Sequence, residues 1–166
     1  MAEFLSVIPE NCLFNKKRTG CGATELAIRN DVPTIIAMPH VALVKNKSLY
    51  RKDGRRVLGV YEGVTEKEIA DYANTCTTLK IATTYDALPR VVNALCNAGK
   101  EPYKDVFLLI DESHDLFYAY KYRYKAIDAM LYEVAKFHRV TCMSATPIER
   151  KYLFDALRHL PTCEIS

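Results

Sequence analysis

The sequence contains no apolar run near the roughly 20 residues that a membrane-spanning helix requires, which argues against a membrane protein. Its first ten residues also lack the basic start and the long apolar stretch of a secretory signal. The six cysteines form no Cys-x-x-Cys pair, and the four histidines complete no zinc-binding spacing. We therefore expect a cytoplasmic protein with reduced thiols and with no metal site built from cysteine.

A large excess of either charge is also lacking, because 23 Lys and Arg face 20 Asp and Glu and leave a net charge of +3. Composition alone therefore does not indicate a nucleic-acid-binding protein. The basic residues are nevertheless concentrated in segment 45–56, where Asp53 is the single acidic residue. This segment is either a solvated loop or a contact surface for phosphates. Its basic residues are Lys45, Lys47, Arg51, Lys52, Arg55 and Arg56.

The chain has 166 residues, 49% of them hydrophobic and 26% charged, which suits one well-buried domain. Short apolar runs alternate with longer segments of helical period, and this pattern predicts an α/β fold with a mostly parallel sheet and helices on both faces. The expected strands are Cys12–Asn15, Thr34–Met38, Val57–Val60, Leu79–Ala82, Val106–Ile110 and Val140–Met143. The expected helices are Thr24–Asn30, Thr65–Thr75, Tyr85–Asn97, Asp115–His138 and Ile148–Leu160.

Four of the expected strands are followed at once by polar or glycine-rich residues. Because the carboxyl ends of parallel strands meet at one edge of a sheet, and ligands bind there, we expect these clusters to form one site. They are segments 19–24, 39–40, 111–114 and 144–147.

Two of these clusters have chemistry that suits a magnesium nucleotide. Asp111 and Glu112 can hold the ion and orient a water, although acidic residues are also favoured at the start of any helix. Gly20 and Gly22 allow the backbone to approach phosphate oxygens, and Thr24 supplies a hydroxyl for the ion. A dinucleotide-binding turn is excluded, because the third glycine is missing and no acidic residue ends the second strand.

Together and in this order, the clusters resemble the first RecA-like domain of superfamily 2 helicases, the DExH-box group. Segment 19–24 resembles the phosphate-binding Walker A motif, 36–43 resembles motif Ia, and 84–88 resembles the Ib region. Segment 111–114 reads Asp-Glu-Ser-His and matches DExH, and 144–146 reads Ser-Ala-Thr and matches the SAT motif. Only the last two are specific on their own, but the ordered set is a strong resemblance.

The resemblance implies a P-loop NTPase that uses ATP and Mg²⁺. Asp111 and Thr24 would hold Mg²⁺, and Glu112 would polarise the attacking water. The residues implied to couple the nucleotide state to movement of a partner domain are His114, Ser144 and Thr146. Those implied to cradle the phosphates are Thr19, Gly20, Cys21, Gly22, Ala23 and Thr24. Those implied to lie against a DNA or RNA backbone are Pro39, His40, Lys45, Lys47, Thr84 and Tyr85.

The sequence departs from this family at Ala23, where the family has the lysine that precedes the threonine of Walker A. That ammonium neutralises phosphate charge, so either hydrolysis is weak or absent, or another cation substitutes. The candidates are Lys16, Lys17 and Arg18 in the same loop, and Arg18 has the spacing of divergent loops that use an upstream lysine.

A second RecA-like domain, which completes the nucleotide cleft in the family, is not encoded in these residues. We therefore expect residues 1–166 to be a single N-terminal RecA-like domain with little activity alone, and its partners to be DNA or RNA and a second RecA-like domain of the same protein. Two functions stay open. The Asp111–Glu112 pair favours the motor domain of an ATP-dependent helicase or translocase, and Ala23 favours a hydrolysis-deficient scaffold that binds nucleotide or nucleic acid.

Four tyrosines alternate with smaller or basic residues within segment 118–124. Aromatic and basic residues together can stack on single-stranded nucleic acid. We expect instead that Tyr120 and Tyr124 face the core and that Tyr118 and Tyr122 lie on the outside of a helix.

Overall fold

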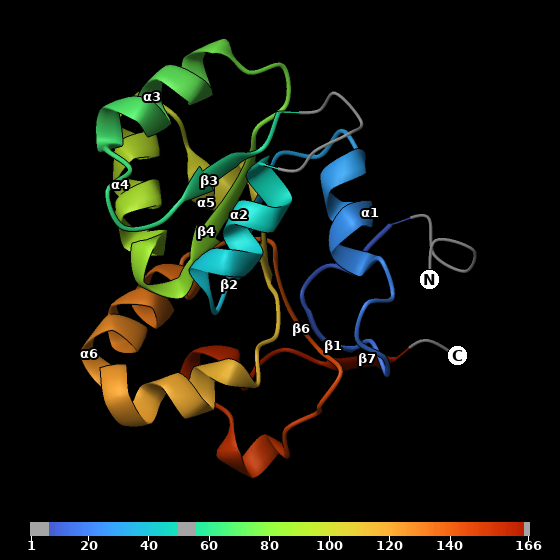
Figure 1. The fold of residues 1–166 in the computed structure, drawn as a ribbon. Helices are drawn as coiled ribbons and strands as arrows, with labels where there is room; N and C mark the ends of the chain where they lie inside the picture. The colour runs from blue at the N-terminus through green and yellow to red at the C-terminus, as the bar shows by residue number, and fades with distance from the viewer. Residues whose placement is uncertain (1–6, 50–55, 165–166) are drawn as a thin grey trace.

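The computed structural model describes residues 7–49 and 56–164, which form one seven-stranded sheet with helices around it (Figure 1). All strand pairs are parallel, and the strand order is β3-β4-β2-β5-β6-β1-β7. The strands are β1 Cys12–Asn15, β2 Thr34–Met38, β3 Leu58–Val60, β4 Lys80–Thr84, β5 Phe107–Ile110, β6 Val140–Ser144 and β7 Thr162–Glu164. The predicted parallel α/β fold is confirmed.

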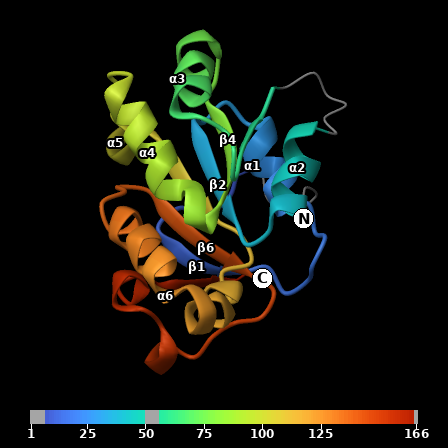
Figure 2. The same cartoon turned by 60° about the vertical axis from the view of Figure 1, so that its left-hand side comes forward.

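Helices cover both faces of the sheet, with α1 and α2 on one side and α3 and α4 on the other (Figure 2). The apolar residues of β2 alternate between two hydrophobic clusters, Ile35 in one and Ile36 in the other, which explains a strand without exposed positions. The α-helices are α1 Ala23–Arg29, α2 Val41–Leu49, α3 Glu66–Thr75, α4 Leu88–Asn97, α5 Pro102–Asp105 and α6 Asp115–Val134. The 3₁₀ turns are η1 Tyr85–Ala87, η2 Arg150–Tyr152 and η3 Asp155–Leu157.

The helix predicted over Ile148–Leu160 is wrong. This segment forms η2 and η3, and the chain then enters β7, a strand that the sequence pattern did not predict. Buried leucines at 153, 157 and 160 imitate a helical period. The guanidinium of Arg150 instead donates to the carbonyl oxygens of Arg158 and Leu160, at 3.1 and 2.8 Å, and holds the segment as a folded loop.

The helix predicted over Asp115–His138 ends at Val134 and bends at Arg123, whose φ of −137° and ψ of 41° are not helical. Figure 1 shows the two halves of α6 at an angle to each other. Because of this bend, Tyr124 is 52% exposed and does not face the core as predicted. Tyr120 is half-buried and packs against Phe154, with ring centroids 5.2 Å apart.

Helix α2 was not predicted, and its second half contains the first residues of the basic segment 45–56. Val44 is fully buried, whereas Val41 and Leu43 are 39% and 38% exposed, so the side chains described for this helix show no clear amphipathic pattern. Of the basic residues in segment 45–56, Arg51, Lys52 and Arg55 lie outside the described residues. In the described ranges, no helix is long and apolar enough to cross a membrane. All six cysteines are described and are present as thiols.

A reciprocal capping box defines the start of α3. The Thr65 hydroxyl accepts from the backbone N–H of Glu68, and the Glu68 carboxylate accepts from the backbone N–H of Thr65 at 2.7 Å. We expect Thr65→Ala to lower the free energy of unfolding by about 1 kcal/mol, measured by urea denaturation, because an N-terminal donor of the helix loses its partner.

Thr65→Ser keeps the hydroxyl and serves as the control, and equal stability of all three proteins would contradict the prediction. The hydrogen bonds from Thr65 also lower the pKa of Glu68. The contribution of this carboxylate is present above its ordinary pKa and is lost as the pH falls through its lower pKa in the folded state. The backbone N–H of residue 65 has the larger effect on this pKa and is kept in Thr65→Ala, so only the smaller, hydroxyl-dependent part of the difference from wild type should be lost in acid.

Candidate functional site

The predicted phosphate loop and the predicted acidic pair meet at the carboxyl edge of the sheet. The loop follows β1 and leads into α1, while Asp111 and Glu112 follow β5. The Thr24 hydroxyl, in the first turn of α1, donates to Oδ2 of Asp111 at 2.9 Å. Both side chains are buried, with Thr24 at 9% and Asp111 at 7% exposure. Two segments almost ninety residues apart in the sequence are thus in direct contact.

Lys16 lies at the centre of this site. Its ammonium donates to Oδ1 of Asp111 at 3.1 Å and to Oε1 of Glu112 at 2.5 Å. Its backbone N–H donates to the carbonyl oxygen of Ser144 at 3.0 Å, which extends the pairing of β1 with β6 by one residue. The side chain is 5% exposed.

The environment of Lys16 keeps it charged. Burial by itself lowers the pKa of the ammonium, but the negative charges of Asp111 and Glu112 and their hydrogen bonds outweigh it. The pKa of Lys16 therefore lies above its ordinary value. The group is a permanent cation between two carboxylates at neutral pH.

Sequence reasoning placed Lys16 among three candidate cations but singled out Arg18 by spacing. Arg18 and Lys17 are exposed, and the Lys17 ammonium lies 3.4 Å from a carboxylate oxygen of Glu164. A usable signal was present, because Cys12, Phe14 and Lys16 are buried at alternate positions and so share one face of β1. That is the face on which α1 packs, since Cys12 and Phe14 belong to the same apolar cluster as Ala27.

The glycines of the loop adopt backbone conformations that other residues rarely take. Gly20 has φ +66° and Gly22 has φ +81°, and a Cβ built on either would meet no atom within 4 Å. These positions therefore favour glycine because of the backbone and not because of crowding. Thr19, Gly20 and Gly22 are exposed and Cys21 is half-buried, so the loop presents its backbone at an open surface.

Ala23 differs from the rest of the loop because it is buried, at 3% exposure, in the apolar cluster beneath α1. The methyl group at this position packs in the core. Residue 23 therefore brings no charge to the loop.

The backbone of the acidic pair is held by Tyr85, which is fully buried. Its hydroxyl donates to the carbonyl oxygens of Asp111 and Glu112, at 2.6 and 3.0 Å. Burial and then the negative charge of Asp111 raise the pKa of the Tyr85 hydroxyl well above its ordinary value, so it stays a donor. Glu112 has φ +50°, a conformation that costs a non-glycine residue about 1–3 kcal/mol. The two hydrogen bonds help to hold it there.

Of the three predicted coupling residues, Ser144 contacts both of the others. Nδ1 of His114 lies 2.7 Å from the Ser144 hydroxyl, which donates to the carbonyl oxygen of Thr146 at 2.9 Å. The backbone N–H of Thr146 donates back to the Ser144 hydroxyl at 2.9 Å. His114 also lies 3.5 Å from Oε2 of Glu112, so this network adjoins the acidic pair.

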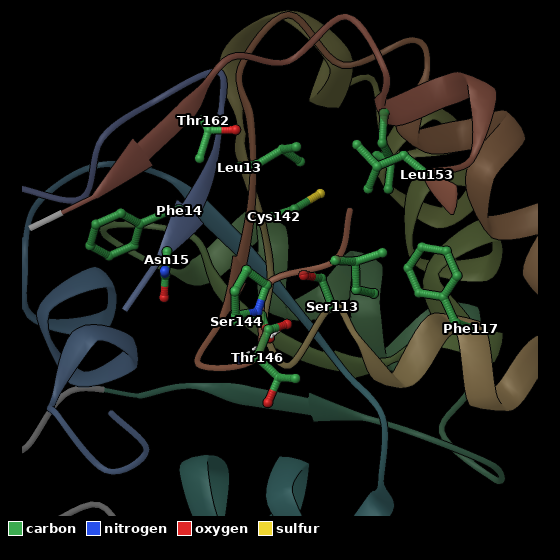
Figure 3. Close-up of a pocket in the computed structure, with 13 residues that line it drawn as sticks. Leu13, Phe14, Asn15, Ser113, Phe117, Cys142, Ser144, Thr146, Leu153 and Thr162 are labelled. Carbon is green, nitrogen blue, oxygen red and sulfur yellow. Dashed lines mark hydrogen bonds between the residues drawn. The ribbon is translucent and has the colours of Figure 1, made fainter. Parts of the chain in front are cut away.

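Ser144 and Thr146 also border a small cavity of about 60 Å³ (Figure 3). Leu13 and Cys142 line it from the sheet, and Phe117 and Leu153 line it from α6 and the folded loop. It is largely apolar, and at about 60 Å³ it is too small to hold a nucleotide.

The structure places three of the six predicted nucleic-acid-binding residues around one groove and the other three elsewhere. His40 is exposed, Thr84 is half-buried, and with Pro39 they line a groove of about 730 Å³ near the carboxyl ends of β2 and β4. Arg90 and Arg123 also line this groove, and Arg123 is paired with Asp86 at 2.6 Å.

The other three predicted nucleic-acid residues do not line the groove. The Tyr85 side chain is buried against the acidic pair, which differs from the surface contact that we expected of it. Lys47 is half-buried and pairs with Glu25 at 2.9 Å, while the Lys45 ammonium lies 5.1 Å from the centre of the Tyr61 ring.

The donor set suits a magnesium ion that a substrate helps to bind. Among residues 7–49 and 56–164, no group of three or more His, Cys, Asp or Glu is placed to hold a metal ion. Asp111 and Thr24 provide one carboxylate and one hydroxyl. Mg²⁺ is commonly held by one or two protein groups, with substrate phosphates and water completing its shell.

Comparison with known proteins supports a helicase-like fold. No family model and no curated protein matches the sequence. Among solved structures, the chain is similar to the helicase domain of Hef from Pyrococcus furiosus, with a TM-score of 0.51 and 16% sequence identity. The match covers 93% of this chain but only 35% of that one, so the chain spans about a third of the helicase structure. The fold is that of a helicase-like RecA domain.

Proposed function

We propose that the chain is the ATP-binding motor domain of a nucleic-acid-dependent ATPase of the helicase type. The observation that carries this proposal is the contact between the glycine loop and the acidic pair, made by the hydrogen bond from Thr24 to Asp111. A loop with two left-handed glycines, a buried hydroxyl and two carboxylates provides a backbone cradle for phosphates, ligands for Mg²⁺ and an acid to orient water, which are parts of a nucleotide-hydrolysing site. The helicase-like fold agrees with it.

The site residues have separate tasks in this proposal. Mg²⁺, held by Asp111 and Thr24, would neutralise phosphate charge there. Glu112 orients a water whose oxygen attacks the γ-phosphorus, and the bond from that phosphorus to the bridging oxygen breaks. The water proton passes to the Glu112 carboxylate and then to solvent, and the products are ADP and phosphate.

DNA or RNA is the proposed macromolecular partner, with the groove lined by His40 and Thr84 as its contact surface. Arg90 and Arg123 supply two positive charges to this groove, and Glu62 and Asp86 supply two negative charges that balance them. Phosphate contacts there therefore depend on Arg123 being freed from the carboxylate of Asp86. Phosphate contacts of this kind weaken as salt increases. A second RecA-like domain of the same protein is the proposed partner at the network of His114, Ser144 and Thr146.

The proposal is tested by titrating the chain with a fluorescent ATP analogue, with and without Mg²⁺. We expect saturable binding that requires Mg²⁺ and that unlabelled ATP reverses. A folded chain that binds no nucleotide at millimolar concentration would overturn the proposal. Adding single-stranded DNA or RNA at two salt concentrations then tests the groove, because phosphate contacts predict weaker binding at higher salt.

A hydrolysis-deficient scaffold is the second candidate, and the burial of Ala23 favours it. It predicts magnesium-dependent binding of ATP with no release of phosphate, even when nucleic acid is present. The motor proposal predicts slow release by this chain and faster release when a second RecA-like domain is supplied. Single-turnover phosphate release therefore separates the two.

A further inference from the structure

We propose that Lys16 supplies the phosphate-binding charge that the loop lacks at Ala23, by moving from the acidic pair to the phosphates when a magnesium nucleotide binds. This inference rests on the proposed nucleotide-binding function and deepens it. It makes Lys16 a substrate-binding residue that also offsets one of the two negative charges of the acidic pair when no nucleotide is present.

The position of Lys16 is the first argument. The Lys16 ammonium and the Thr24 hydroxyl bond to different oxygens of the same carboxylate, Oδ1 and Oδ2 of Asp111. The ammonium therefore lies within the site, beside the start of α1 and the end of β5. Lys17 and Arg18 extend from the exposed part of the loop.

Competition for Asp111 is the second argument. Two carboxylates share one ammonium, so the cluster of Lys16, Asp111 and Glu112 has a net charge of −1. A divalent cation that takes oxygen ligands from Asp111 competes with the ammonium for the same carboxylate. A buried cation that loses one partner needs another anion, and nucleotide phosphates are the anions that arrive with the metal.

The reach of the side chain is the third argument. The Lys16 backbone is fixed by its hydrogen bond to Ser144, whereas its four-carbon stem can reorient and its ammonium has three donors. The ammonium can therefore keep one bond to Glu112 while another donor turns toward a phosphate. No movement of the strand is required.

The test compares Lys16→Met with wild type for equilibrium binding of ATP, ADP and AMP in the presence of Mg²⁺. Methionine keeps most of the stem and removes the charge. We expect the affinity for ATP to fall about 10- to 100-fold, since hydrogen bonds to charged groups are lost, while binding of AMP changes little. Lys17→Met, which removes an exposed ammonium next in the chain, should stay within about twofold of wild type.

Mg²⁺ without nucleotide provides a second readout. Lys16→Met leaves the carboxylates of Asp111 and Glu112 without their cation, so the variant should bind Mg²⁺ more tightly than wild type does. A general loss of structure would weaken binding of Mg²⁺ and nucleotide together. Circular dichroism and thermal unfolding accompany each variant. If Lys16→Met does not fold, Lys16→Gln retains donors for the carboxylates without charge, and the same results are expected.

The outcomes separate this inference from the function on which it rests. If wild type binds magnesium nucleotide and the uncharged variant binds ATP equally well, with the same preference over AMP, the role of Lys16 is overturned and the proposed function stands. If folded wild type binds no magnesium nucleotide, the proposed function fails first and the inference fails with it.

Discussion

Glu112→Gln is expected to bind magnesium nucleotide within a few-fold of wild type and to release phosphate about 10²–10⁴ times more slowly. Glutamine has the size of glutamate and keeps an oxygen that can accept from Lys16, but it cannot take a proton from the attacking water. The rate is measured as phosphate release in a single turnover, so that a slow basal reaction is sufficient.

Glu101→Gln is the matched control for this experiment, because Glu101 is an exposed carboxylate that precedes α5 and β5, whereas the acidic pair follows the opposite, carboxyl end of β5. It should release phosphate at the wild-type rate. A Glu112→Gln protein that is as fast as its control would remove Glu112 from the reaction and leave the site as a binding site only.

The largest expected effect on stability is at Tyr85. Tyr85→Ala should lower the free energy of unfolding by about 3–5 kcal/mol, because a fully buried aromatic ring is lost and a cavity remains. Tyr85→Phe keeps the ring and removes only the hydroxyl that bonds to Asp111 and Glu112, and it should cost about 1–3 kcal/mol. Urea denaturation monitored by circular dichroism measures both values.

Tyr122 is 86% exposed and provides the matched control. Tyr122→Ala should change the free energy of unfolding by no more than about 0.5 kcal/mol. If Tyr85→Phe is as stable as wild type, the hydroxyl does not hold the acidic pair. In that case another interaction keeps Glu112 in its left-handed conformation.

The sequence predicted the sheet more accurately than the segments beyond it. Strands β1 and β2 begin and end at the predicted residues, because apolar runs bounded by polar residues have few other ways to bury themselves. The segment from 148 to 160 was mistaken for a helix because leucine spacing describes burial and not backbone geometry. Contacts of Arg150 with two distant carbonyl oxygens decided that geometry, and no local pattern encodes them.

The site shows the same division between local and distant information. Motif spacing located Thr24, Asp111 and Glu112, and the structure brings them together. Motif spacing did not reveal which of the three consecutive cations turns inward, because that depends on the alternation of β1, which continues to Lys16 and buries its side chain. The prediction that Tyr85 contacts nucleic acid at the surface was wrong for a similar reason, because the motif does not show which way the side chain points. Its neighbour Thr84 is half-buried and its neighbour Asp86 is exposed, and only the packing of η1 turns the ring between them inward.

Residues 84–86 also connect the groove to the acidic pair. Thr84 and Asp86 border the groove, and Tyr85 between them fixes the two carbonyl oxygens of the acidic pair. One peptide unit on each side separates the two regions, and no flexible spacer lies between them. Under the proposed function, a nucleic-acid strand that displaces Asp86 from Arg123 would therefore pull on the same turn that anchors Glu112. We propose that binding in the groove alters the position of Glu112 through this one buried turn.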